Sequence, residues 1–220
     1  SVANISYFFP KDRKGSALGV NAGFGNLGVS VVQFLSPIVV TVGVLGIFGG
    51  DPQTIVRNGQ SVQVWTQNAA FIWVPWIAIT ALIAWFAMND VADAKASFAA
   101  QAAIFMRKHN WLMCLLYLGT FGSFIGFAAG FPLLIKSLFP AVNPLAYAWL
   151  GPLVGALIRP FGGWLSDKIG GGVVTQWNFV VMAAAVVGVI YFLPRTGGAL
   201  ALPFGPEAGS FTGFFLMFLV

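Results

Sequence analysis

The stretch GPLVGALIRPFGG, residues 151–163, decides the fold because it places one arginine inside a long apolar segment. Arg159 is the only charged side chain between residues 137 and 166. A charge near the centre of a bilayer costs about 3 kcal/mol on insertion scales, so such residues usually face a polar cavity or an ion path and have a partner. The stretch therefore predicts a membrane helix built around a functional arginine.

Glycines accompany this arginine. At 3.6 residues per turn, Gly151, Gly155 and Gly163 share one stripe with Arg159, which leaves room for a neighbouring helix or a small ligand. An arginine that only holds helices together, through a buried carboxylate or through carbonyl groups, is the alternative. Because the chain has no carboxylate at comparable depth, we predict an anion or substrate site.

The composition indicates a polytopic membrane protein. Hydrophobic residues make up 58% of the 220, charged residues only 8%, and the mean hydropathy is +0.86. The formal charge, 11 − 6 = +5, comes without a basic stripe interleaved with aromatics, so no nucleic acid partner is expected. Cys114 and His109 each stand alone, which predicts no disulfide framework, no metal site and no cofactor.

The apolar segments predict an all-α bundle. Expected spans cover residues 15–50 (one span with flanking turns), 69–88, 111–131, 146–166 and 173–193, with a helix tail before them and another start at Phe211. Residues 49–67 are expected to form a loop, and residues 89–110 a linker with an amphipathic surface helix. An opening without a charged leader and a short apolar end indicate an internal part of a longer protein.

Basic residues predict the orientation. The loops at residues 10–14, 89–110 and 166–172 hold seven Lys or Arg, whereas the alternate loops hold three. The positive-inside rule therefore puts the first set in the cytoplasm.

The first span carries glycines and amides. Gly15, Gly19 and Gly23 repeat at i, i+4 and i+8, which is typical of close helix packing in lipid. Asn26 begins a polar stripe with Ser30 and Gln33 at i+4 and i+7, and polar groups need partners inside a membrane. Asn21 points roughly 140° away from Asn26.

A second polar group lies in the span that starts at Trp111. Tyr117, Thr120, Phe121 and Phe124 occupy one helix face. Such a face is also common on core or lipid-exposed helices. A phenol at this depth needs a hydrogen-bond partner, however, and an anion held by an arginine would be one.

Three stretches resemble the nitrate/nitrite porters of the major facilitator superfamily. GSALGVNAGFGNLGVSVVQFLSP, residues 15–37, is similar to their first nitrate signature, WLMCLLYLGTFGSFIGF, residues 111–127, to helix 7, and WLGPLVGALIRPFGGWLSDKIGG, residues 149–171, to helix 8. The resemblance implies a chain running from the end of helix 4 to the start of helix 10 of twelve. Residues 1–88 would be the second half of the N-terminal lobe, 89–110 the cytoplasmic linker between lobes, and 111–220 the first half of the C-terminal lobe.

The same resemblance implies a set of substrate-binding residues. Arg159 matches one of two arginines that clamp the substrate, Tyr117 a hydrogen-bond donor and Phe121 an aromatic wall. Asn26, together with Asn21, Gly23 and Gly25, matches the signature helix that lines the same cavity. The other arginine and the second signature belong to helices 2 and 11, which this chain does not contain. Gly170 to Gly172 are expected to form only a hairpin between helices 8 and 9.

The implied function is secondary transport of nitrate and nitrite across a bacterial inner membrane. The resemblance implies a multi-pass monomer embedded in the lipid bilayer. It also implies that the protein is not an enzyme. Guanidinium is planar and binds oxyanions through two parallel donors, which suits nitrate. The five spans hold no Asp, Glu or His that could take up a proton, which favours nitrate/nitrite exchange. Proton symport, a carrier for another small anion, and a membrane enzyme or scaffold are the alternatives.

Overall fold

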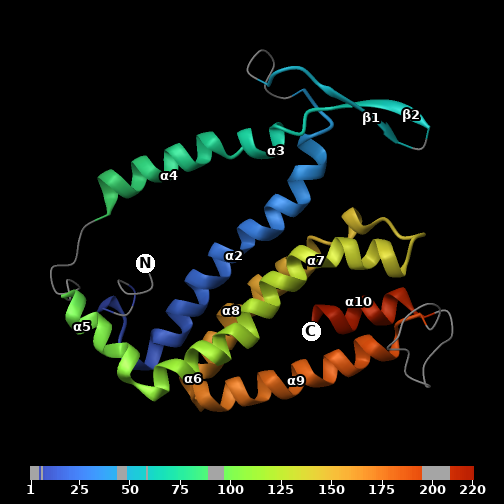
Figure 1. Cartoon of the computed structure of the whole chain (residues 1–220). Helices are drawn as coiled ribbons and strands as arrows, with labels where there is room; N and C mark the ends of the chain where they lie inside the picture. Colours follow the sequence, from blue (N-terminus) through green and yellow to red (C-terminus); the bar gives the residue numbers. More distant parts are fainter. Residues whose placement is uncertain (1–4, 6, 44–48, 58, 89–96, 195–208) are drawn as a thin grey trace. The chain divides into compact units, whose positions relative to one another are not determined.

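The chain was analysed as a computed structural model that describes all residues except 1–4, 6, 44–48, 58, 89–96 and 195–208 (Figure 1). Most of this part is helical, which confirms the all-α prediction. The helical elements are η1 Lys11–Arg13, α2 Lys14–Val39, α3 Asn68–Phe71, α4 Val74–Ala87, α5 Phe98–Ala102, η4 Ala103–Met106, α6 Lys108–Tyr117, η5 Leu118–Gly122, α7 Ser123–Leu138, η6 Pro144–Ala146, α8 Leu150–Ile169, α9 Gly171–Tyr191 and α10 Phe211–Leu219.

Contacts divide the chain into two compact units. The first contains Ser1–Ser30 and Ala96–Val220, and the second contains Val31–Lys95. The first unit thus includes α2 as far as Ser30 and every described helix from α5 onward. The lobe boundary expected at residues 89–110 stays a prediction, because residues 89–96 lie outside the described part; the rest of that linker forms α5, η4 and the start of α6.

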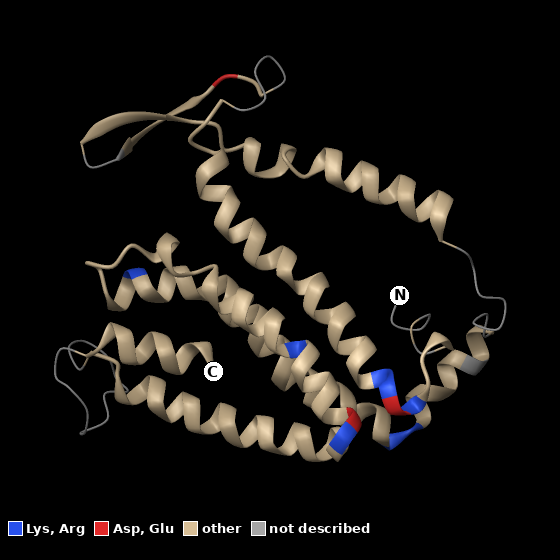
Figure 2. Ribbon diagram, turned by 180° about the vertical axis from the view of Figure 1, so that it is seen from behind, with Lys and Arg blue, Asp and Glu red and all other residues tan. Residues whose placement is uncertain are grey.

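Four helical segments are long and apolar enough to cross a membrane: Lys11–Val39, Asn68–Ala87, Lys108–Leu138 and Gly171–Tyr191. They coincide with four of the predicted spans. The fifth predicted span is α8, which has 20 residues but is less apolar because it carries Arg159, Asp167 and Lys168. Figure 2 shows that the charged positions of the ribbon lie mainly near helix ends.

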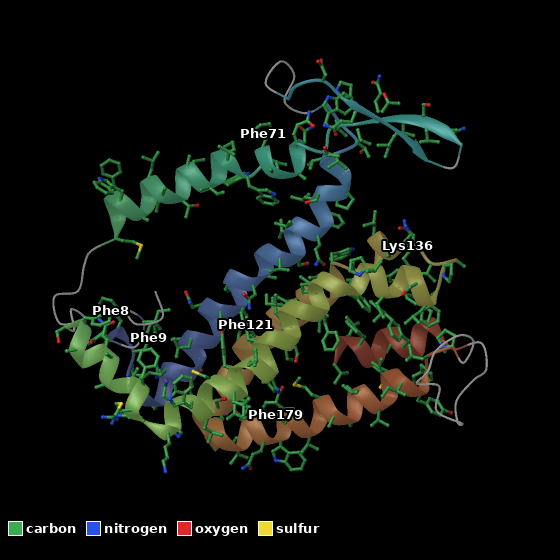
Figure 3. The ribbon with its side chains drawn as sticks, viewed as in Figure 1. Phe8, Phe9, Phe71, Phe121, Lys136 and Phe179 are labelled. Carbon is green, nitrogen blue, oxygen red and sulfur yellow. The ribbon has the colours of Figure 1, made fainter. Side chains whose placement is uncertain are left out.

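The span that starts near Trp111 is longer than predicted. It runs from Lys108 through α6, η5 and α7 to Leu138. Lys136, which we expected in a loop, therefore lies in the last turn of α7 (Figure 3), where a cation interacts favourably with the helix dipole.

The second unit corrects the loop prediction for residues 49–67. Strands β1 Gln53–Arg57 and β2 Gln60–Val64 pair in antiparallel fashion, with Arg57 opposite Gln60. The two residues between the strands are Asn58 and Gly59, the dipeptide most typical of tight hairpin turns, and Gly59 has a φ of 77°. Gly, Pro and Asn are enriched both in irregular loops and in tight hairpin turns, so this composition alone does not distinguish the two.

The core of the first unit is aromatic. Phe131 of α7 and Phe214 of α10 are 1% and 0% exposed, and Ile135 lies with them. The ring of Phe131 stacks on Phe218 with centroids 3.9 Å apart. This cluster packs α10 against α7 and the end of α9.

Candidate functional site

Arg159 lies near the middle of α8 and is partly buried. Its side chain meets groups from two other helical segments of the first unit. These are the amide of Asn26 on α2 and the rings of Phe121 and Phe124 at the junction of α6 and α7. The structure therefore brings together three of the predicted substrate-binding residues, Arg159, Asn26 and Phe121, although they are far apart in sequence.

The amide of Asn26 sits directly on the guanidinium. The amide atom that faces Arg159 lies 2.9 Å from Nη1, 3.1 Å from Nη2 and 3.2 Å from Nε. Guanidinium offers only donors, so this atom must be the amide oxygen. The three nitrogens surround one carbon in a plane, and an atom this close to all three lies over the face of the group. The N–H bonds lie in the plane and point past Asn26.

Aromatic rings flank the same cation. The guanidinium carbon of Arg159 is 5.2 Å from the ring centroid of Phe121 and 5.2 Å from that of Phe124. Both distances are within the range of cation–π attraction. Among the described residues, the groups around the Arg159 guanidinium are thus a neutral amide and aromatic rings, which leave the positive charge in place.

Tyr117 contacts Phe121 and forms the next ring of this aromatic row. It stacks on Phe121 with centroids 5.0 Å apart, and Phe121 stacks in turn on Phe124 at 6.1 Å. Tyr117 is 60% exposed, so it lies toward the outside of this aromatic row. Its predicted role as a hydrogen-bond donor to an anion stays a prediction.

The helix is irregular where these rings leave it. Residues Leu118–Gly122 form a single π-helical turn, η5, between α6 and α7, and Phe121 lies within it (Figure 3). Single π-helical turns within α-helices occur often at functional sites. The predicted regular 3.6-residue period therefore does not hold through Leu118–Gly122.

The glycines of α2 pack against α8. A Cβ on Gly19 would lie 2.6 Å from the backbone oxygen of Arg159, and one on Gly23 would lie 2.7 Å from that of Ala156. Gly15 meets the backbone of Gly163 in the same way. The close packing expected from the i, i+4, i+8 spacing is therefore present, and it places Asn26 opposite Arg159.

The other predicted site residues take different positions. Gly155 lies under the ring of Phe124, so the glycines of α8 pack against both α2 and α7. A Cβ on Gly25 or Gly151 would meet nothing within 4 Å among the described residues. Asn21 is exposed, as its angular offset from Asn26 suggested. Gly23 belongs to the helix contact, while Asn21 and Gly25 do not join the group around Arg159.

Asp167 makes a contact that sequence reasoning missed. Its carboxylate accepts hydrogen bonds of 2.7 Å from the backbone N–H of Gly15, from the backbone N–H of Ser16 and from the Ser16 hydroxyl. The bonds from Ser16 lower the pKa of Asp167 below its ordinary value, because they stabilise the charged form. The carboxylate joins the last turn of α8 to the first turn of α2. The signal available in the sequence was an acidic residue, Asp167, directly after the apolar segment that ends at Ser166.

A cation in mid-helix, small-residue helix contacts and four membrane-capable segments indicate a polytopic helical membrane protein. No family model matches the chain. It is 48% identical over 219 residues to the nitrate/nitrite transporter NarU of Salmonella typhimurium and 47% identical over 221 residues to NarU of Escherichia coli, in both cases across its full length. It is also 46% identical over 199 residues, 88% of the chain, to a Thermus thermophilus protein named "Probable nitrate/nitrite antiporter NarK2".

The chain belongs to the nitrate/nitrite porter family of the major facilitator superfamily. It spans 45% of the length of each of these three relatives. The resemblance found in the three sequence stretches is thereby confirmed.

Proposed function

We propose that this protein carries nitrate and nitrite across the cytoplasmic membrane of a bacterium, by alternating access between two lobes. The names of the relatives support this substrate pair, since all three name nitrate and nitrite. It performs transport and no covalent chemistry. Arg159 is the principal anion ligand in this part of the protein.

The observation that carries the proposal is the orientation of Arg159. Asn26 covers one face of the guanidinium and leaves its in-plane N–H bonds directed elsewhere. Those bonds form the planar fork that binds two oxygens of an oxyanion at once. Because a neutral amide and aromatic rings surround the cation, its charge is available to attract an anion.

Nitrate suits this arrangement. It is planar and singly charged, so a bidentate pair with one guanidinium matches both its shape and its charge. The rings of Phe121 and Phe124 exclude water beside the cation, which strengthens the electrostatic attraction. Phe121 is thus a wall of the site, and Tyr117 supplies a hydroxyl at its outer end.

Exchange of nitrate for nitrite is the transport mode that we favour. Arginine does not release its proton at physiological pH, and the five predicted spans hold no Asp, Glu or His. An unpaired positive charge in a low-dielectric cavity makes reorientation of the carrier without an anion slow. A bound anion neutralises that charge, and the name of the Thermus relative includes the word antiporter.

The test is Arg159→Lys in the full-length transporter, reconstituted in proteoliposomes. We expect nitrate binding to fall at least about tenfold, because a point-like ammonium cannot reproduce the fork. Arg107→Lys is the matched control, since Arg107 is exposed just before α6. Wild-type binding in Arg159→Lys would contradict the proposed role of this residue.

The same vesicles distinguish exchange from proton symport. Vesicles preloaded with nitrite should take up nitrate faster than empty vesicles at matched membrane potential, with or without a proton gradient. Uptake that ignores internal nitrite and follows the proton gradient would instead establish symport.

A further inference from the structure

We propose that a groove between η1, the start of α2 and the end of α8 binds an acidic phospholipid. The groove lies entirely within the first unit and is separate from the site around Arg159. Its ligand is a membrane component, so the proposal does not depend on which ion the protein transports.

The groove has the size and lining of a site for an amphiphile. Its volume is about 620 Å³, within the range of small-molecule sites. Apolar side chains form half of its lining, namely Ile5, Phe9, Ala17, Val20 and Trp164. Phe9, Val20 and Trp164 are each more than 40% exposed, so apolar surface is accessible beside the groove. An acyl chain would cover this surface.

Cations also line the groove. Arg13 and Lys168 belong to its lining, and Lys11 and Lys14 flank it in sequence. Two carboxylates, Asp12 and Asp167, also line it, so the lining has no net charge (2 − 2 = 0), and the positive excess comes from Lys11 and Lys14 beside it. Asp167 already accepts three hydrogen bonds from Gly15 and Ser16, so it is engaged with the protein. With Asp167 engaged in this way, the positive charges in and beside the groove outnumber the remaining negative charge, which favours an anionic headgroup.

Lys168 is positioned as lipid-facing cations commonly are. Its ammonium lies 4.1 Å from the ring centroid of Trp164, one turn earlier on α8. Tryptophan is enriched where hydrocarbon meets headgroups, and an ammonium over its face is held at that level. The distribution of basic loops puts this end of α8 on the predicted cytoplasmic side, where acidic lipids concentrate.

Apolar lining and cations together distinguish a lipid from a free anion. Basic pockets between membrane helices on the cytoplasmic side bind acidic headgroups, and each basic residue near the surface contributes about 1 kcal/mol. A small inorganic anion would use Arg13 and Lys168 but would leave the apolar part of the groove uncovered. Phosphatidylglycerol uses both parts.

The experiment uses the full-length transporter in a neutral detergent, with native mass spectrometry to count retained lipids. Phosphatidylglycerol should be retained and should raise the midpoint of thermal unfolding, whereas phosphatidylcholine with the same acyl chains should not. The double variant Arg13→Gln with Lys168→Gln should lose about fivefold in lipid affinity for each cation removed. The double variant Lys108→Gln with Lys136→Gln removes the same charge outside the groove and should behave as wild type.

A second variant tests the apolar part without changing any charge. Ala17→Phe adds a bulky ring to the lining of the groove and should also reduce retention of phosphatidylglycerol. Equal retention of both lipids, or unchanged retention in both groove variants, would overturn the proposal. If inorganic phosphate alone stabilises the protein as much as phosphatidylglycerol does, the groove is an anion site and the lipid assignment is wrong.

Discussion

Asp167 binds Ser16 twice, through 2.7 Å hydrogen bonds from the backbone N–H and from the hydroxyl, across 151 residues of sequence. A third bond comes from the N–H of Gly15. Amide groups at a helix start lack partners within the helix and carry partial positive charge, so a carboxylate is favoured there. The contact closes one end of the α2–α8 pair, and Asn26 and Arg159 meet further along the same pair.

Removing the carboxylate should weaken this helix pair more than removing the hydroxyl. Asp167→Ala deletes all three bonds, whereas Ser16→Ala deletes one and keeps both amide bonds. We therefore expect a lower midpoint of thermal unfolding in both variants of the full-length protein, and a larger decrease in Asp167→Ala. Asp12→Ala, at an exposed position in η1, is the control. Equal midpoints for Asp167→Ala and Asp12→Ala would show that the contact contributes nothing to stability.

The contribution of Asp167 should depend on pH with a defined sign. Its pKa is lowered from 3.8 in the folded protein by the bonds from Ser16, so folding favours the ionised form. The stabilisation is fully present above the unfolded pKa and is lost as pH falls through the lower, folded value. The difference in unfolding midpoint between wild type and Asp167→Asn should be constant above about pH 5 and shrink below about pH 4. A difference that grows on acidification would contradict this assignment.

Two glycines of α2 should respond to alanine with opposite signs. A Cβ on Gly19 would lie 2.6 Å from the backbone oxygen of Arg159, so Gly19→Ala must separate α2 from α8, at a cost of about 1–3 kcal/mol for overpacking. Gly28 has nothing within 4 Å among the described residues, and Gly28→Ala should gain up to about 1 kcal/mol of helix propensity. Thermal unfolding of the two variants gives the comparison. Similar shifts in both would mean that α2 does not approach α8 this closely.

Charge on the face of Arg159 should control anion affinity. Asn26→Asp puts a carboxylate where the neutral amide now lies, which neutralises the guanidinium and should lower nitrate affinity at least about tenfold. Asn26→Ala keeps the positive charge and should cost less. Asn178→Asp is the control, because Asn178 is exposed on α9 and contacts Met182. Calorimetric titration of the purified full-length variants with nitrate measures the effect, and wild-type affinity in Asn26→Asp would refute it.

Local patterns predicted the elements well. Apolar runs located the helices, the glycine spacing predicted the α2 packing, and Arg159 stood out because charge is costly in lipid. Prediction was poorer where a residue's partner lies far away in sequence. The expected partner of Arg159 was an anion, with a carboxylate or carbonyl groups as the alternative, whereas Asn26, 133 residues earlier, contacts it with an amide. Asp167 and Ser16 escaped notice for the same reason, since no periodicity relates them.

The π-helical turn at Leu118–Gly122 has a consequence for how this helix tolerates change. A π-helical turn closes i→i+5 instead of i→i+4 hydrogen bonds, so it uses one more residue than an α turn for nearly the same rotation. The wide turn therefore takes up the extra residue locally, and the faces of α6 and α7 keep their relation across it. Deleting one residue within η5 should leave a regular helix with Tyr117 and Phe124 in nearly their present directions. An inserted residue beside η5 would instead turn α6 by about 100° relative to α7, so this helix should tolerate a single deletion here better than a single insertion.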